Sequence, residues 1–279
     1  MSAAVDHDVV EIDVEAWQGH ACVGSIVGTG RRVLVGTHDA CGECEVCRAG
    51  GATVCPLAKP RELSSRIRVM GRWVVALQDG LDLPSPAAAA VPGDVALAYT
   101  AYARTSISAA DAVVIVGKSP VTRFLVEILR AKAIVPTVVV EGEDDGWTGW
   151  LTGKGAVFVT VTTRADAAAQ VREAIAGQGR GVRPTRVIAT SSDAAELACQ
   201  LAYRRGTLTL LPTSQRGLDI GLAAEREVTV IGVARAHPDL VVEAAALCVK
   251  GEVDLIQGTT TDPGHPTRSH VSPVPDPPP

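Results

Sequence analysis

Several features that mark other classes of protein are scarce or missing in this sequence of 279 residues. Aromatic residues make up only 3% of it, so a buried core has to be built mainly from Ala, Val, Leu and Ile. It has no Lys- or Arg-rich stripe, and its formal net charge is −5, which argues against a dedicated nucleic-acid-binding protein. No uninterrupted apolar run approaches the roughly 18 residues of a membrane span.

The N-terminal stretch also lacks a targeting signal. MSAAVDHDVVEID is acidic and has no basic region followed by an apolar run, so it does not resemble a secretory signal. The chain has seven cysteines, and four of them lie close together, which points to metal binding rather than to a disulfide framework. We therefore expect a cytoplasmic protein that binds a small molecule, and neither nucleic acid nor membrane.

The composition that is present belongs to a globular protein, because 47% of the residues are hydrophobic and 20% are charged. The first hundred residues carry short β-type runs at 22–28, 31–36 and 67–77, with Gly and Pro between them.

From about Asp111 the pattern becomes an alternation of buried strands and helices. The expected strands lie at 112–117, 137–141, 156–161, 186–190, 207–211 and 227–234, and the expected helices at 119–133, 164–177, 191–206 and 237–251. Such an alternation predicts an α/β fold, a doubly wound parallel sheet of the Rossmann type with helices on both faces.

These patterns divide the chain into three parts. We expect a β-rich domain over residues 1–105, a nucleotide-binding domain over 106–255 and a disordered tail over 256–279. The tail is assigned on composition, because it is rich in Pro and poor in apolar residues.

The strongest single motif is the C-x2-C-x2-C-x7-C run of Cys41, Cys44, Cys47 and Cys55. The two-residue gaps let successive thiolates face one centre, and the longer gap lets the chain return to close a tetrahedron. Four thiolates leave no open position, so the pattern predicts a structural zinc site. An iron–sulfur cluster is the alternative, because bacterial ferredoxins also combine C-x2-C-x2-C with a Cys-Pro pair.

The surroundings of this cysteine lobe carry a family pattern. Gly19-His20-Ala21 is followed by Val23-Gly24, then by Gly30-x-x-Val33, the four cysteines and the βαβ run. In this order the elements resemble the zinc-containing alcohol dehydrogenases of the medium-chain dehydrogenase/reductase superfamily. The resemblance implies a GroES-like domain, here shortened at its N-terminus, before the Rossmann domain. It also implies a homodimer formed through the Rossmann domain, with 225–233 as the candidate edge strand.

The resemblance further implies a second, catalytic zinc, and this part of the pattern is incomplete. His20 matches the family's histidine ligand, but Ala21 replaces the glutamate that follows it, and Ser2 stands where the family has a cysteine. Asp94 is the candidate for the remaining ligand. Cys22 is a possible substitute, because residues i and i+2 of an extended segment share a face. His20 as a structural histidine and Cys22 as a buried apolar thiol remain the alternatives.

Candidates for proton transfer and for cofactor binding follow from the same comparison. His7 or Ser106 could shuttle a proton. Gly117, Ser119 and Val121 stand in the loop that would hold the pyrophosphate of NAD, although Thr122 replaces the last glycine of G-x-G-x-x-G. Glu141, at the end of the second strand of the alternation, is the candidate for binding the adenosine ribose, and a carboxylate there favours NAD over NADP.

Three interpretations of function remain open. The first is a zinc-binding, NAD-linked oxidoreductase that transfers hydride between NAD and a small alcohol or polyol, or the corresponding carbonyl. The second is a dehydrogenase-like scaffold without redox activity, which acts as a binding or regulatory protein or in non-redox chemistry. The third is that a longer native chain supplies the missing N-terminal strands.

Overall fold

The computed structural model describes residues 9–77, 83–142, 146–161, 164–178, 183–191, 193–211 and 218–255. The chain divides into two compact units, residues 1–97 with 235–279, and residues 98–234. The candidate His7 and the Pro-rich segment 256–279 lie outside the described residues. Within those residues, no helix has both the length and the apolar character needed to cross a bilayer.

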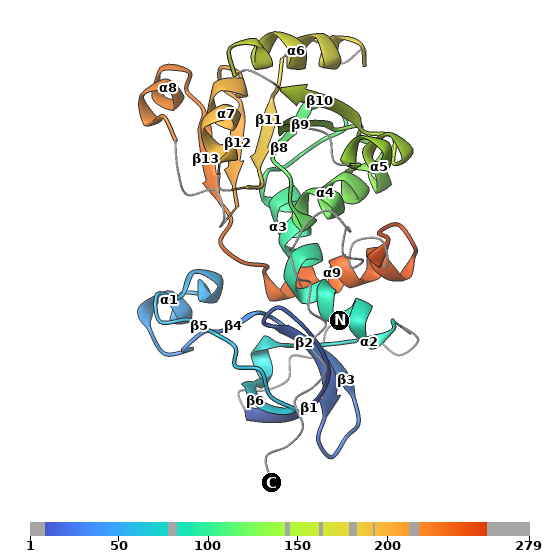
Figure 1. Cartoon of the computed structure of the whole chain (residues 1–279). Helices are drawn as coiled ribbons and strands as arrows, with labels where there is room; N and C mark the ends of the chain where they lie inside the picture. The colour runs from blue at the N-terminus through green and yellow to red at the C-terminus, as the bar shows by residue number, and fades with distance from the viewer. Residues whose placement is uncertain are drawn as a thin grey trace. The chain divides into compact units, whose positions relative to one another are not determined.

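The first unit is built on a curled, antiparallel, GroES-like sheet of five strands in the order β6-β1-β2-β3-β7 (Figure 1). The strands are β1 (Val9–Gln18), β2 (Ala21–Ile26), β3 (Arg32–Val35), β6 (Arg66–Met70) and β7 (Val74–Ala76). Apolar side chains alternate with polar ones along β1, so that Ile12 and Val14 point inward to a core that also contains Trp17, Cys22 and Val33. This alternation gives the sheet one buried and one exposed face.

Short helices complete the first unit. Helix α2 (Ser85–Ala90) packs on β1 and β2, and a π-helical turn, η3 (Val91–Val95), follows it. Helix α9 (Pro238–Val249) returns to pack on η3 and β7. The cysteine lobe holds α1 (Glu45–Arg48) and η1 (Ala52–Val54), and is closed by the pairing of β4 (His38–Asp39) with β5 (Lys59–Pro60).

The second unit is a six-stranded, wholly parallel sheet in the order β10-β9-β8-β11-β12-β13. Its strands are β8 (Val113–Val116), β9 (Thr137–Glu141), β10 (Val157–Val161), β11 (Arg186–Ala189), β12 (Thr207–Leu210) and β13 (Thr229–Gly232). Its helices are α3 (Ala96–Arg104, from residue 98 on), α4 (Pro120–Ala131), α5 (Trp147–Gly153), α6 (Arg164–Ala176), α7 (Ala194–Leu201) and α8 (Ile220–Glu225). The order of the strands reverses between β8 and β11, which is where doubly wound sheets open a ligand-binding crevice.

The structure confirms the fold class and the six expected strands of the second half. The segment 225–233 does contain the edge strand β13. Strand β1, the helical stretch from α2 to α3, and helices α5 and α8 were not predicted. The Ala-rich stretch 85–104 gives little contrast between faces, which explains why its helical period was not visible.

The units divide the chain at different positions from the domains expected from the sequence. The sequence suggested boundaries after residues 105 and 255, whereas the compact units divide after residues 97 and 234. Residues from Arg235 on group with the first unit because α9 buries Val241, Ala244 and Ala245 there. Helix α9 therefore follows the Rossmann strands in sequence but adds to the core of the β-rich unit.

Gly24 provides a test of the sheet in the first unit. A Cβ atom at this position would lie 2.4 Å from the Asp13 carbonyl oxygen on the paired strand β1. We expect Gly24→Ala to lower the free energy of unfolding by about 1–3 kcal/mol, because the strands have to move apart. Urea unfolding measures the change. Gly36→Ala is the matched control, since nothing lies within 4 Å of its Cβ position; an equal loss in both variants would contradict the close approach.

Candidate functional site

The four cysteines of the lobe gather around one centre. The Sγ atoms of Cys55 and Cys41 are 3.6 Å apart, those of Cys44 and Cys55 3.9 Å, and those of Cys41 and Cys47 4.0 Å. A tetrahedral zinc with bonds of about 2.3 Å requires sulfur separations of about 3.8 Å. A cluster of several irons would divide the thiolates between different irons and so spread the sulfurs farther apart. The geometry therefore fits one tetrahedral ion held by all four thiolates.

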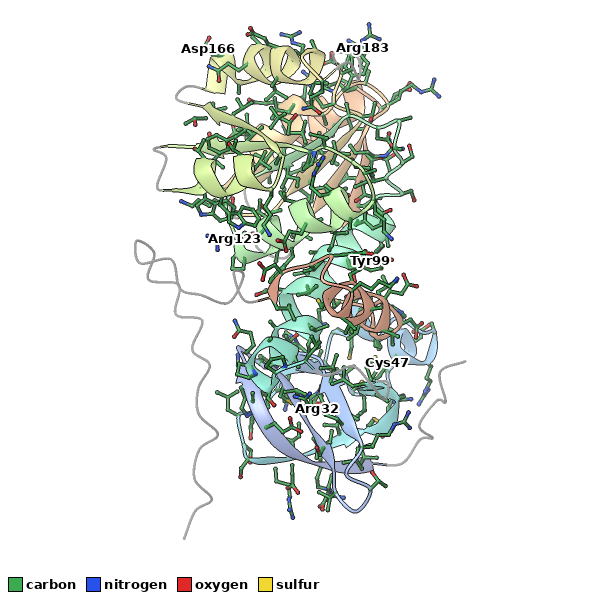
Figure 2. All side chains as sticks on the ribbon, turned by 90° about the vertical axis from the view of Figure 1, so that its right-hand side faces the viewer. Arg32, Cys47, Tyr99, Arg123, Asp166 and Arg183 are labelled. Atoms are coloured by element: carbon green, nitrogen blue, oxygen red, sulfur yellow. The ribbon has the colours of Figure 1, made fainter. Side chains whose placement is uncertain are left out.

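Backbone N–H groups of the lobe already favour the thiolate form. The amide of Cys44 donates to Cys41 Sγ, and the amide of Cys47 donates to Cys44 Sγ, each at 3.4 Å. The backbone donors of Cys44 and Glu43 lower the pKa of Cys41 to about 6. Burial, by contrast, raises the pKa of Cys47 to about 12. Since metal binding requires deprotonated sulfur, Cys41 is the thiol of the lobe that is best prepared for a cation. Figure 2 labels Cys47 within this lobe.

His20 lies in the turn just before β2, and its ring is oriented by the backbone. Its Nδ1 atom is 2.8 Å from the carbonyl oxygen of Arg61. A carbonyl only accepts hydrogen bonds, so Nδ1 carries the proton and Nε2 of the neutral ring keeps its lone pair. The side chain is exposed. His20 can therefore act at Nε2 as a base or as a metal ligand.

Arg61 is the residue that organises this region, and no sequence motif pointed to it. It is only 3% exposed, and its guanidinium donates to the carbonyl oxygens of Gly36 at 3.1 Å and His38 at 3.3 Å. It also forms an ion pair with Asp39 at 2.6 Å. One buried side chain thus fixes the segment 36–39, while its own backbone oxygen holds His20.

The described residues form no three-ligand metal site around His20. Cys22 packs in the sheet core beside Trp17 and Val33, and burial raises its pKa to about 12. Asp94 lies in η3. Among the residues that the structure describes, the four lobe cysteines are the only group of three or more His, Cys, Asp or Glu side chains close enough to share an ion. A catalytic zinc at His20 does not fit the described ligands.

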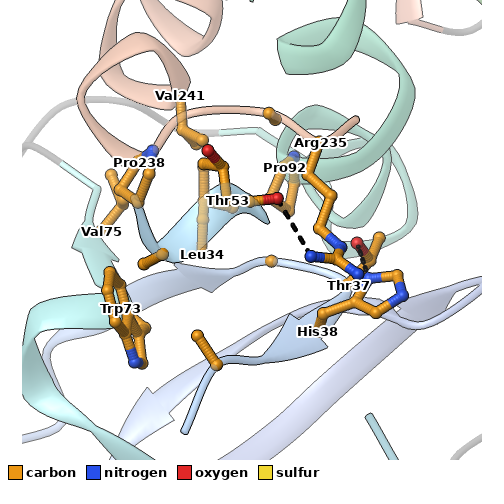
Figure 3. Close-up of a pocket in the computed structure, with 14 residues that line it drawn as sticks. Leu34, Thr37, His38, Thr53, Trp73, Val75, Pro92, Arg235, Pro238 and Val241 are labelled. Carbon is orange, nitrogen blue, oxygen red and sulfur yellow. Dashed lines mark hydrogen bonds between the residues drawn. The ribbon is translucent and has the colours of Figure 1, made fainter. Parts of the chain in front are cut away.

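A pocket opens in the first unit between the lobe, the sheet and the start of α9, with about 600 Å³ of empty space including the part open to solvent. Figure 3 shows Thr37, His38 and Arg235 together on one side of it, and Trp73, Val75 and Pro238 on the other. The remaining lining residues are Leu34, Gly36, Ala40, Ala52, Thr53, Pro92, Ala236 and Val241. The pocket combines an apolar wall with a polar one, as small-molecule sites do.

The polar wall of the pocket is electropositive. Thr37 Oγ1 and His38 Nδ1 share a hydrogen bond of 2.8 Å. Burial, and then the positive charges of Arg235, of His20 when it is protonated, and of Arg61, lower the pKa of His38, against the opposing charge of Asp39. These residues were not singled out from the sequence, because segments far apart in the chain supply them.

In the second unit, Gly117 lies at the reversal of strand order, directly after β8. Its φ is +107°, and a Cβ atom there would lie 2.3 Å from Ser191 Oγ, so only glycine fits. This is the role that the first glycine of a dinucleotide-binding loop fulfils.

The start of α4 carries the other loop candidates. Ser119 is the N-cap of the helix and accepts a hydrogen bond from the Thr122 amide. Pro120, which has no N–H, follows it, and Val121 lies in the first turn. Thr122 is fully buried; its hydroxyl lies 2.7 Å from that of Thr190 and donates to the Gly117 carbonyl at 3.1 Å. The branched side chain that departs from the glycine pattern is thus held by its own hydrogen bonds.

The remaining candidates of the second unit are Glu141 and Ser106. Glu141 is half-buried at the carboxyl end of β9, where the ribose-binding acid was expected. The Lys118 ammonium lies 5.5 Å from the ring centre of Trp147, and the Arg123 guanidinium lies 4.9 Å from it. These cation–π contacts connect the loop after β8 and helix α4 to α5. Ser106 is exposed, in the turn after α3.

Comparison with known proteins bears on the fold. No family model and no curated protein matches the sequence. Solved structures do: D-arabinose dehydrogenase from Sulfolobus solfataricus is 18% identical, with a TM-score of 0.70 over 89% of each chain. A short-chain alcohol dehydrogenase from Escherichia coli, complexed with NADH, is 17% identical, with a TM-score of 0.72 over 92% of this chain and 83% of the other. An alcohol dehydrogenase from Thermus sp. ATN1 is 14% identical, with a TM-score of 0.74 over 90% and 84%. The chain has the fold of these dehydrogenases.

The cysteine lobe yields a prediction about metal content. We expect the purified chain to hold about one zinc ion, and Cys47→Ser to lose it, because three thiolates remain in a site built for four. Elemental analysis measures zinc per chain. Cys199→Ala, a buried cysteine outside the lobe, should keep its zinc. Strong visible absorbance with iron in place of zinc would contradict the assignment.

Asp94 yields a prediction about pH. Burial raises its pKa from 3.8 to about 6, so the folded chain binds this proton more tightly than the unfolded chain does. The ionised carboxylate therefore destabilises the fold, fully above about pH 6 and not at all well below pH 4. Asp94→Asn should stabilise the protein by on the order of 1–3 kcal/mol at pH 7.5, and this gain should shrink between pH 6 and pH 4. Urea unfolding at several pH values measures it, and a gain independent of pH would contradict burial as the cause.

Proposed function

We propose that this chain is a divergent member of the medium-chain dehydrogenase/reductase superfamily that binds NAD(H) and a structural zinc. Its proposed activity is hydride transfer between NAD and a small alcohol or polyol, or the corresponding carbonyl. We also propose that it acts in the cytoplasm as a homodimer joined through the Rossmann unit, whose edge strand β13 is exposed.

One observation carries the proposal: a glycine that no other residue can replace lies at the reversal of a Rossmann strand order. The backbone at Gly117 comes so close to Ser191 that a side chain is excluded, and the first turn of α4 follows it. A pyrophosphate group binds at such a junction through helix N–H groups. The likeness to dehydrogenases, one of them complexed with NADH, supports the same cofactor.

When bound, NAD(H) would accept or supply the hydride. The chain itself offers His20 for the accompanying proton. With Nδ1–H held by the Arg61 carbonyl, Nε2 is the atom that takes up a proton from an alcohol or returns one to a carbonyl oxygen. The cysteine lobe has all its thiolates directed to one centre, so its ion would be structural.

A second candidate function is a binding scaffold without redox activity. It is favoured by Thr122, whose buried side chain occupies the place of the last loop glycine, and by the lack of a three-ligand site around His20 within the described residues. Both candidates share the zinc lobe and differ in cofactor binding.

Titration with NADH separates the two. We expect saturable binding, and Gly117→Ala should weaken it at least about tenfold, because the new methyl group overlaps Ser191 and the backbone has a positive φ. Isothermal calorimetry measures the affinity. Gly149→Ala is the control, since its Cβ position is open. A zinc-loaded, folded chain that does not bind NADH or NADPH would overturn the dehydrogenase proposal and leave the scaffold.

A further inference from the structure

The pocket of the first unit carries a positive charge that no acidic residue in its lining balances. Arg235 contributes a guanidinium, whereas none of the residues that line the pocket is Asp or Glu. Within the described part of the chain, the one hydrogen bond of this guanidinium runs from Nη1 to the Thr53 carbonyl at 3.0 Å. Asp39, the nearby carboxylate that affects His38, is already held by Arg61.

The free donors of Arg235 have a definite shape. A guanidinium has five N–H donors, and the Thr53 carbonyl engages one of them. The edge formed by Nε and Nη2 remains available, and its two parallel N–H bonds match the two oxygens of a carboxylate. The hydroxyl of Thr37 and the ring of His38 lie on the same side of the pocket (Figure 3).

The opposite wall is apolar. Trp73, Val75 and Pro238 form it, and Leu34 and Val241 extend it. An occupant that buries this wall has to carry a hydrocarbon or aromatic body, and one that satisfies Arg235 has to carry an anionic end.

We infer that this pocket binds a small organic acid, with its carboxylate on Arg235 and its apolar body against Trp73 and Val75. One guanidinium supplies one fixed positive charge, which balances a carboxylate but not a phosphate dianion. The inference goes beyond the proposed function and concerns the pocket of the first unit alone, because all residues that line it belong to that unit.

Matched ligands test the inference on the zinc-loaded full chain without NAD(H). The probes are phenylacetate, phenylacetamide of nearly the same shape, and phenyl phosphate. We expect phenylacetate to bind at least about tenfold more tightly than the amide, as the loss of one charge-assisted bidentate pair implies. Calorimetry gives the affinities. Equal affinities for acid and amide, or tighter binding of phenyl phosphate, would overturn the assignment.

Variants locate the effect. Arg235→Met should reduce the preference for acid over amide to about twofold or less while leaving amide binding nearly unchanged. Arg235→Lys should retain part of the preference. Arg68→Met, on the exposed face of β6, is the control and should leave it intact. An undiminished preference in Arg235→Met would overturn the role of Arg235, and the acid–amide comparison in the unaltered chain stands even if this variant does not fold.

The outcome is separable from that of the cofactor titration. Acid binding with no NADH binding would remove the dehydrogenase and keep the pocket as an acid-binding site. NADH binding with no preference for the acid would remove this inference and leave the proposed activity intact.

Discussion

A single buried guanidinium organises the first unit. Arg61 is taken out of water almost completely, and a charge in that position costs several kcal/mol unless partners surround it. Its partners are two carbonyl oxygens and the carboxylate of Asp39, all within the segment 36–39. That segment leads into the cysteine lobe and forms the polar wall of the pocket, while the backbone of Arg61 orients His20. The lobe, the pocket and the histidine therefore share one electrostatic anchor.

The fold was predictable where a pattern repeats locally. The alternation of buried strands with helices after Asp111 predicted all six strands of the parallel sheet, because a strand covered on both faces is a short, continuous apolar run. Strand β1 was missed although its inward residues Ile12 and Val14 alternate with charged ones. The helical stretch 85–104 was missed because alanine contributes little to any periodicity, and because α2 depends on packing against β1 and β2.

Only part of the candidate site was predictable from the sequence, for the same reason. The cysteine lobe was predictable because its ligands lie within fifteen residues and their spacing alone nearly determines the geometry. The pocket was not, since His38, Trp73 and Arg235 are far apart in sequence and only the return of the chain through α9 brings them together. Arg61 could not be found from a motif, because its role consists of bonds to backbone oxygens, which any sequence offers. The sequence predicted that Cys22 lies in a strand. It did not predict which face of the sheet the thiol occupies, because that depends on the core against which the strand packs.

The bridge between the Thr122 and Thr190 hydroxyls makes these two positions depend on each other. Each hydroxyl oxygen also lies 3.1 Å from a backbone carbonyl oxygen, Thr122 from that of Gly117 and Thr190 from that of Val116. With one proton apiece, one hydroxyl donates across the bridge and the other to its carbonyl. Replacing Thr122 by glycine would delete one partner, leave a buried hydroxyl short of a hydrogen bond and open a void between helix and sheet. The last glycine of the dinucleotide-binding pattern would therefore destabilise this chain unless Thr190 also changed. The effects on stability of substitutions at these two positions should thus not be additive.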